Sequence, residues 1–568
     1  MYIATVPNRS SPPAILLREG YREGGKVKNR TLANLSQWPA PKVDLLRRLL
    51  RDEALAPVDA LCAVVASTHH GHVQAVRTTM QRVGFAALLA PRPSRERDLV
   101  VAMVAARILE PDSKLATTRW WHTTTLPADL GVRDADEDAL YEAMDWLLER
   151  QDRIEQTLAA RHLRAGGFVL YDLTSSYFEG TTCPLAAFGH NRDGKKGKLQ
   201  VNYGLLTDGR GCPVAVSVFK GNTGDPPTLL PAVRRVRERF GIEQLVVVGD
   251  RGMIAQTQIT ALQGLAGVAW LTALKTGAIR DLVAGGHVQL GLFDERNLFE
   301  LTHPDFPGER LVACRNPELA KLRAHKRQAL LAATVKELDK VRGMVARGTL
   351  KGREAIGVRI GKVVNKYKVA KHIRLDIHDD RVEFQIDEPR VAAEAALDGI
   401  YVIRTSVPAE RLDAADAVRH YKRLSDVERA FRSLKTIDLK VRPIRHRLEE
   451  RVRAHIFLCL LAYYVEWHMR EAWRPLLFSD EDQAAKQTRD PVAPAKRSAA
   501  ALRKVHTKVL ADGTPVHSFS TLLKDLSRIV RNVCRSRGAG PEAPTFELVT
   551  TPDSTQQRAY DLLKTITV

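Results

Sequence analysis

The sequence predicts an α/β fold in which helices flank a mixed β-sheet, and three observations predict it. Three short apolar segments follow one another in the manner of a β-meander, with an Asp-Gly-Arg-Gly turn at 208–211. Four consecutive apolar residues at 245–248 are typical of a strand buried on both faces. Helical segments lie on either side of that strand, and another strand follows at 268–275. The meander segments are residues 168–171, 199–206 and 214–219.

This order of three strands, helix, strand, helix and strand is that of a ribonuclease H-like core. Upstream of it, residues 1–45 are predicted to form strands joined by a turn at 22–25, where two glycines follow each other. The region 46–165 is predicted to be largely helical, because its apolar residues recur at helical spacing.

An insertion is predicted between the two parts of the core, at 276–417. It begins with a charged helix at 317–342 and is otherwise expected to be rich in β-strands. Helices are predicted again at 414–435 and 451–473, and the polar residues 479–498 suit a linker. The expected strands of the insertion are 356–364, 373–377, 381–386 and 400–405.

The chain therefore divides into six predicted regions. They are an N-terminal strand and turn segment (1–45), a helical region (46–165), the first part of the core (166–275), the insertion (276–417), the second part of the core (418–478), and a linker with the C-terminal region (479–568).

Charge points to nucleic acid as a partner. The 568 residues carry a formal net charge of +21, and each phosphate that a protein neutralises releases counterions. The basic residues are clustered: residues 346–374 hold nine Lys or Arg against one acid, and 429–453 hold nine against three. A uniformly basic surface is the alternative, and the clustering favours nucleic acid over it.

Other features exclude several classes of protein. The six cysteines include no Cys-x-x-Cys pair, which argues against a zinc finger and against a secreted disulfide framework. The longest apolar run, 454–467, is too short to cross a bilayer. The first residues lack the basic and apolar regions of a signal peptide. We therefore expect a cytoplasmic protein with no membrane partner.

Two acids follow strands of the predicted core. Asp172 ends the first strand, and Asp250 ends the apolar strand at 245–248. Open α/β sheets bind ligands at the carboxyl ends of their strands. A single Asp after a strand is usually a turn or helix-cap residue, and Glu179 and Asp426 are rival acids, so the pattern by itself leaves these alternatives open.

A third acid, Glu428, lies on the helix predicted at 414–435. Tyr421, Glu428 and Lys435 are seven residues apart and fall nearly on one face, which Arg432 joins. By itself, Glu428 with Arg432 is most often a solvated ion pair. An apolar stripe beside this face is expected to dock the helix. It consists of Leu424, Val427, Phe431 and Leu434.

These residue types suit a two-metal site. Magnesium prefers hard oxygen ligands, and two such ions about 4 Å apart can activate one oxygen and stabilise another during displacement at phosphorus. Three carboxylates are sufficient to hold them. Cationic residues beside Glu428 suit phosphate.

Several motifs together resemble those of bacterial insertion-sequence transposases of the DDE type, in the cut-and-paste group with a Tyr-Arg-Glu-Lys signature. The matching stretches are 171–175, 190–193, 198–205, 221–225 and 248–253, with Tyr421, Glu428 and Lys435 for the signature. Leu424 stands at the signature's Arg position, with Arg423 just before it, and a shift of one residue turns a helical side chain by about 100°.

The resemblance implies cleavage at the element's ends and strand transfer into target DNA. Asp172, Asp250 and Glu428 would be the catalytic residues and bind two divalent cations, Mg²⁺ with Mn²⁺ as a substitute. Tyr421 and Lys435 would hold DNA phosphates, and Arg432 is assigned with them. The implied partners are double-stranded DNA, with terminal inverted repeats and target, and a second copy of the chain on paired ends, at the bacterial nucleoid. Support of the site or turn stabilisation is expected of Asn191, Arg192, Gln200, Asn222 and Asp225.

Two other functions compete with this interpretation. A ribonuclease H-like nuclease without strand transfer would share the carboxylates, although the large insertion argues against it. A catalytically silent DNA-binding protein derived from a transposase is the second, and the presence of all three acids argues against that one.

Overall fold

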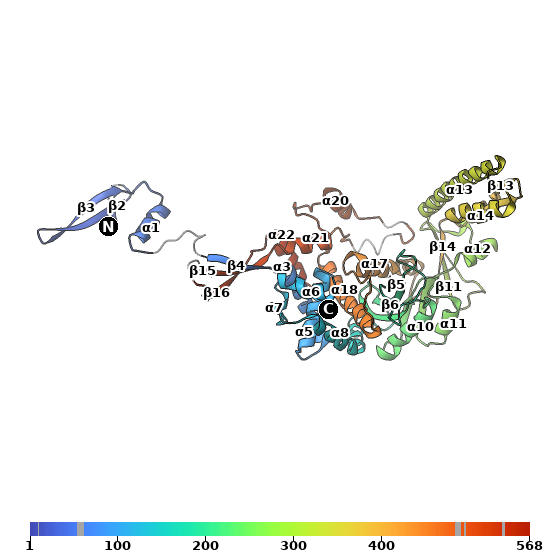
Figure 1. Cartoon of the computed structure of the whole chain (residues 1–568), viewed down its shortest axis with the longest axis horizontal. Coiled ribbons are helices and arrows are strands. Elements are labelled where there is room, and N and C mark those ends of the chain that lie inside the picture. Colours follow the sequence, from blue (N-terminus) through green and yellow to red (C-terminus); the bar gives the residue numbers. More distant parts are fainter. Residues whose placement is uncertain (10, 54–61, 483–489, 494–495, 537–539) are drawn as a thin grey trace. The chain divides into compact units, whose positions relative to one another are not determined.

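A computed structural model of the chain describes residues 1–9, 11–53, 62–482, 490–493, 496–536 and 540–568 (Figure 1). The chain forms two compact units. One consists of Met1–Thr68 and Val530–Thr550, and the other of His69–Ile529 and Thr551–Val568. Much of the linker predicted at 479–498 falls on residues 483–489 and 494–495, which lie outside the described residues.

The smaller unit contains two three-stranded sheets. In the first, β1 (Tyr2–Val6), β2 (Ala14–Glu23) and β3 (Lys26–Asn34) are antiparallel, and α1 (Ala40–Leu49) follows. The β2–β3 hairpin turns at Gly24 and Gly25, whose φ angles of 58° and 77° suit glycine. This part confirms the strands and turn predicted for 1–45.

The second sheet of this unit joins distant parts of the sequence. Its order is β16 (Thr545–Val549), β15 (Val530–Ser536) and β4 (Cys62–His69). The helical prediction for 46–165 is therefore wrong at Cys62–His69. The β-branched residues Val64, Val65 and Thr68 favour a strand there, and a partner strand from near the C-terminus completes it.

The rest of the region before the core is helical, as predicted. Serine or aspartate side chains cap several of these helices, as Ser94, Ser113 and Asp136 do at α5, α6 and α8. The helices are α3 (Gly71–Arg82), α4 (Phe85–Leu89), α5 (Arg95–Leu109), α6 (Lys114–Trp120), α7 (Leu126–Asp129), α8 (Glu137–Glu149) and α9 (Gln151–His162).

Helix α18 (Glu449–Ala472) joins this helical region to the sheet. It is apolar on nearly all sides, which is typical of a helix buried within a protein. Helix α18 contacts α5 and α8 and also strand β7 (Pro213–Lys220); Figure 1 shows α18 next to α5 and α8. No helix among the described residues meets the length and apolarity that crossing a membrane requires.

The central sheet has eight strands in the order β10-β11-β14-β9-β8-β5-β6-β7. The meander is antiparallel, whereas β8 is parallel to both β5 and β9. Both findings confirm the predicted strand order. The strands of this part are β5 (Phe168–Tyr177), β6 (Gln200–Asp208), β7 (Pro213–Lys220), β8 (Leu245–Val248) and β9 (Val268–Ala273), with helices α10 (Pro226–Arg234) and α11 (Gln256–Gln263).

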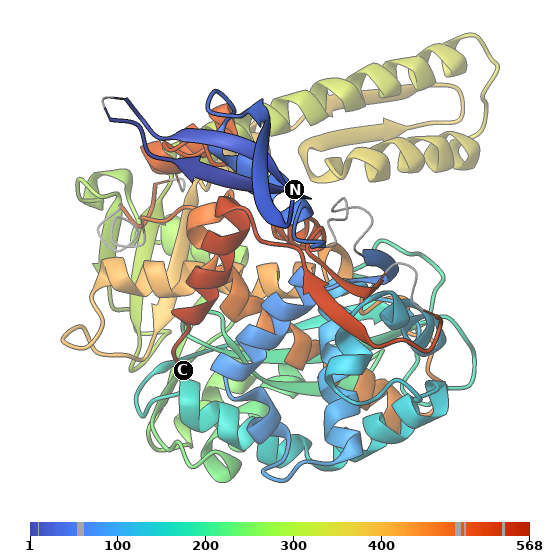
Figure 2. The same cartoon turned by 90° about the vertical axis from the view of Figure 1, so that its left-hand side faces the viewer.

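Residues of the predicted insertion extend the same sheet. Strand β14 (Ile400–Thr405) pairs antiparallel with β9, and β11 (Arg310–Arg315) and β10 (Leu298–Leu301) continue beyond it. Residues between β11 and β14 include the long helices α13 (Pro317–Ala346) and α14 (Arg353–Tyr367), shown in yellow in Figure 2, and the hairpin β12 (Ile373–Ile377) and β13 (Val382–Ile386).

The expectation of a β-rich insertion is therefore wrong in one respect. Residues 356–364, expected as a strand, lie in helix α14. Ile356, Ile360 and Val364 are buried and four residues apart, which is the spacing of one helix face. They pack with Leu338 and Val341 of α13 in a core of their own.

A buried ion pair connects α9 to the core. Glu155 is fully buried, pairs with Arg235, and accepts hydrogen bonds from Gln151 Nε2 (2.8 Å) and from the backbone N–H of Val216 in β7 (3.1 Å). Burial raises the pKa of Glu155 to about 7, against the opposing charge of Arg235. The carboxylate depends on these partners, because a buried charge without them is strongly unfavourable.

We expect Arg235→Met to lower the melting temperature by roughly 5 °C or more at pH 8, because Glu155 is left as an unpaired buried charge. The loss should shrink on acidification, since a group with a raised pKa takes up a proton in the folded state below about pH 7. Calorimetry of the full chain measures it. Arg95→Met is the matched control, since the Arg95–Asp134 pair is exposed. Equal shifts for both variants would contradict this account of Glu155.

Candidate active site

The pairing of β5 with β8 brings two of the predicted acids together. The strands are parallel, and the last paired residues are Leu170 and Val248. Asp172 and Asp250 each lie two residues further on, so they occupy matching positions at the same edge of this pairing. Strand β5 itself continues to Tyr177 alongside β6, so Asp172 lies within the strand rather than at its end.

Backbone groups fix both carboxylates. Asp250 Oδ1 accepts hydrogen bonds from the N–H groups of Gly252 (3.0 Å) and Met253 (2.6 Å), in the turn that follows β8. Asp172 Oδ1 accepts one from the N–H of Leu173 (2.8 Å). These backbone hydrogen bonds hold each side chain in place.

Glu428 comes from a helix that docks on β5. The predicted helix 414–435 is divided: Arg423 separates α16 (Ala414–Lys422) from α17 (Leu424–Arg432), and a π-helical turn covers Ser433–Ile437. Val427 and Phe431 of α17 are buried, and the Phe431 ring lies edge-on to Tyr203 of β6 at 5.9 Å between centroids. The predicted apolar stripe therefore docks α17 and leaves Glu428 exposed on the other side.

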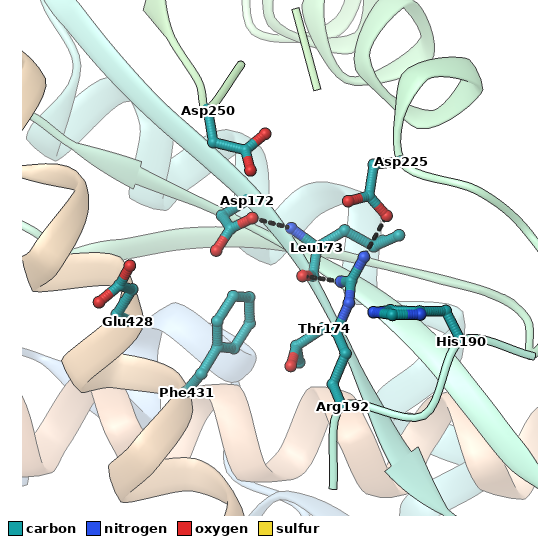
Figure 3. Close-up of a pocket in the computed structure, with 9 residues that line it drawn as sticks. All are labelled: Asp172, Leu173, Thr174, His190, Arg192, Asp225, Asp250, Glu428 and Phe431. Atoms are coloured by element: carbon teal, nitrogen blue, oxygen red, sulfur yellow. Dashed lines mark hydrogen bonds and ion pairs between the residues drawn. The ribbon is translucent and has the colours of Figure 1, made fainter. Parts of the chain in front are cut away.

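The three acids line one pocket. The pocket has a volume of about 420 Å³, and Asp172, Asp250 and Glu428 reach it from β5, from the turn after β8 and from α17 (Figure 3). These residues are far apart in the sequence, so only the fold brings them together. The other lining residues are Leu173, Thr174, His190, Arg192, Asp225 and Phe431.

The electrostatics of the pocket suit a bound cation. Burial, together with the neighbouring charge of Asp250, raises the pKa of Asp172 to about 7. Arg192 lies nearby, but its guanidinium is held by Asp225 and by the carbonyl oxygen of Leu173. A cluster of carboxylates fits a hard divalent cation, which binds oxygen ligands and favours their ionised form.

Arg192, Asp225 and His190 also line the pocket, although none of them was among the predicted catalytic residues. The Gly-Asn-x-x-Asp pattern at 221–225 is the feature of the sequence that points to Asp225. Gly189 and Gly221 allow this arrangement, because a Cβ on either glycine would overlap backbone atoms of the facing segment. The loop with His190 and Arg192 is thereby held against the turn that leads to Asp225.

The predicted DNA-binding residues differ in how far they are exposed and in what they contact. The Tyr421 hydroxyl has a pKa raised to about 12, by burial and by the charges of Asp250 and Glu428, so Tyr421 lies beside the acids. Arg432 is exposed. Lys435 is buried instead, and its Nζ donates to Asp193 Oδ1 at 2.9 Å. The expectation that Lys435 shares an open face with Glu428 is not met, because a π-helical turn begins after Arg432 and redirects it.

Residues 166–465 match the family described as transposase DDE domain, which spans more than half of the chain. The chain belongs to the DDE transposase family. Residues 3–57 match the description IS1634 family transposase, N-terminal domain. The protein is therefore a DNA transposase of an insertion sequence, and the pocket with Asp172, Asp250 and Glu428 lies within the matched catalytic domain.

Two solved structures are similar to parts of the transposase. One is a piggyBac transposase synaptic complex with hairpin DNA, with 8% identity over 80% of this chain and 77% of that chain and a TM-score of 0.36. The other is a Mos1 transposase paired-end complex with left transposon end, with 12% identity over 34% of this chain and 66% of that chain and a TM-score of 0.15. No curated protein matches the chain.

Proposed function

We propose that Asp172, Asp250 and Glu428 are the catalytic residues of the transposase and hold two divalent cations, Mg²⁺ with Mn²⁺ as a substitute. The observation that carries this proposal is their convergence on one pocket from three distant segments. When bound, such ions activate an attacking oxygen and stabilise the leaving oxygen of a phosphodiester. The strand order β7-β6-β5-β8-β9 supports assigning this core to the ribonuclease H-like fold.

Residues around the pocket would position DNA. Tyr421 lies beside the acids, and the exposed Arg432 lies one turn of α17 after Glu428, where its guanidinium suits a phosphate. Lys435 would position neighbouring residues rather than bind a phosphate, because a phosphate contact would break its ion pair with Asp193. The assignment of Tyr421, Glu428 and Lys435 to a Tyr-Arg-Glu-Lys signature belongs to this proposal.

Arg423, next to the signature's Arg position, has another role. Its Nη1 donates to the carbonyl oxygen of Gly209 at 2.8 Å, in the turn between β6 and β7. Leu424 packs against the core. We infer that Arg423 positions α17 and that the chain does without a signature Arg at the pocket.

The proposed partners are double-stranded DNA, with terminal inverted repeats and target, and a second copy of the transposase on the paired end. The helical region before the core would bind the ends. The net charge of +21 supports a polyanionic partner, and the place of action would be the bacterial nucleoid.

Incubating the purified transposase with labelled DNA from the flanks of its own gene, with and without Mg²⁺, tests this function. We expect magnesium-dependent nicks at the element ends, followed by joining to target DNA. Cleavage without joining would support a nuclease instead, and binding without cleavage would support a silent DNA-binding derivative.

The raised pKa of Asp172 predicts how metal binding depends on pH. Below about pH 7 the carboxyl of the metal-free protein is protonated, so a proton competes with the metal. We expect the apparent affinity for Mn²⁺ to fall by about tenfold for each pH unit below 7 and to level off above it. Titration calorimetry from pH 5.5 to 8.5 with the unmodified transposase measures this. An affinity that stays constant across that range would contradict the placement of Asp172 in the metal site.

A further inference from the structure

A second cluster of metal-binding side chains lies outside the acid pocket. His162 is the last residue of α9, Cys212 lies in the turn between β6 and β7, and His468 lies on α18. The ligand atoms of these three residues all lie within 4.8 Å of one another. They come from three separate elements, so their convergence is not a consequence of sequence proximity.

The cluster holds a polar atom that has no partner. The side chain of His468 is 6% exposed, and its Nε2 has no hydrogen-bond partner among the described residues. A buried imidazole nitrogen without a partner is costly, because it loses its contact with water and gains nothing in exchange. Cys212 is fully buried at the same place. A ligand that accepts a lone pair from Nε2 would remove this cost.

Surrounding groups hold the three residues in position. The Tyr464 hydroxyl lies 3.0 Å from His162 Nε2, and Asp208 Oδ1 accepts the backbone N–H of Cys212 at 2.9 Å. Hydrogen bonds of this kind orient metal ligands in proteins. Burial lowers the pKa of His162 to about 4 and that of His468 to about 3, so both rings are neutral at pH 7.

Arg210 lies beside the cluster. Its Nη2 lies 3.4 Å from His162 Nδ1, its Nε donates to Asp208 Oδ2 at 2.9 Å, and its guanidinium lies over the Trp467 ring. The carboxylate of Asp208 thus offsets the charge of Arg210.

We propose that His162, Cys212 and His468 form a zinc site. Two imidazole nitrogens and one thiolate are donors that suit Zn²⁺, and three protein ligands leave a fourth position of a tetrahedral site for water. Nitrogen and sulfur donors favour zinc at this place over a second site for hard, oxygen-loving magnesium.

The proposed site bears on the active site through the β6–β7 turn. Gly209 of this turn accepts the hydrogen bond from Arg423, and a Cβ at Gly211 would lie 2.9 Å from the Cβ of Asp426 in α17. Zinc on Cys212 would tie this turn to α9 and α18. The turn would then be a fixed support for the helix that carries Glu428.

The test uses the full chain with Asp172→Asn, Asp250→Asn and Glu428→Gln, so that the acid pocket does not contribute zinc. After incubation with zinc sulfate and desalting, we expect about one equivalent of zinc per chain by mass spectrometry of the metal, and a higher melting temperature than in EDTA. Cys212→Ser and His468→Gln should each remove the zinc and its thermal effect. Cys183→Ser, at a buried cysteine outside the cluster, should retain both. Equal zinc content in Cys212→Ser and Cys183→Ser, or no bound zinc, would overturn the proposal.

A second measurement needs no change at Cys212. Cobalt(II) bound to a thiolate gives a charge-transfer band in the near ultraviolet. The measurement uses the Cys62→Ser variant, because this change removes the pair of thiols formed by Cys62 and Cys534. We expect the band to be present in this variant. A cobalt spectrum without the thiolate band would show that Cys212 is an ordinary buried thiol. Because neither readout involves DNA or cleavage, a failure here leaves the proposed function of the acid pocket unaffected.

Discussion

Asp172→Asn is expected to abolish magnesium-dependent cleavage of the element ends. The amide keeps the shape of the side chain and can still accept the hydrogen bond from Leu173, so the change removes only the charge that a cation requires. The loss should exceed the roughly 10–100-fold that follows removal of a group hydrogen-bonded to a metal ligand. Asp250→Asn and Glu428→Gln should behave alike, because the three acids line one pocket.

Two further readouts separate this effect from damage to the fold. End binding should be retained in all three variants when it is measured without metal. The melting temperature of Asp172→Asn should equal or exceed that of the unmodified transposase at pH 8, since burial and the charge of Asp250 disfavour the ionised Asp172. Cleavage at the unmodified rate by any one variant would remove that residue from the site.

Asp193→Ala is expected to have the largest effect on stability. The Asp193 side chain is 2% exposed, pairs with both Lys435 and Arg442, and accepts the N–H of Tyr177 in β5 at 2.9 Å. Removing it leaves two cations unpaired in a mostly buried place, which costs about 3–5 kcal/mol. The melting temperature should fall by roughly 5 °C or more in calorimetry of the full chain.

The rate of cleavage should also fall in Asp193→Ala, because Asp193 connects two parts of the active site. Lys435 follows the helix of Glu428, and Arg192, the residue before Asp193, lines the pocket. Lys435→Met should reproduce part of the loss of cleavage while its end binding keeps the salt dependence of the unmodified transposase. A clearly shallower salt dependence would instead show that Lys435 contacts a phosphate. Asp134→Asn, at an exposed pair, is the control and should change neither stability nor cleavage.

The sequence was sufficient for those parts of the fold that local patterns determine. The meander, the apolar run Leu245–Val248 and the segment 268–275 after it correctly predicted five strands and their order. Asp172 and Asp250 could be chosen because each follows an apolar segment of the sequence, although Asp172 lies within β5. The apolar stripe around Val427 and Phe431 correctly predicted how the helix of Glu428 docks.

Features that depend on distant partners were not predictable in this way. Strand β4 pairs with β15, which lies far away in the sequence, and β14 joins the central sheet only because β9 offers it an edge. Arg423, between α16 and α17, donates a hydrogen bond to Gly209, which is far away in the sequence. Lys435 could not be assigned to Asp193 from spacing alone, because a π-helical turn changes its direction.

The most direct test of the central claim is a crystal structure of the transposase with Mn²⁺ and end DNA, with data collected at the manganese absorption edge. We predict anomalous peaks in the pocket within about 2.5 Å of carboxylate oxygens of Asp172, Asp250 and Glu428. Manganese bound elsewhere, or bound without any oxygen of Glu428 within reach, would contradict the assignment of these three acids to one metal site.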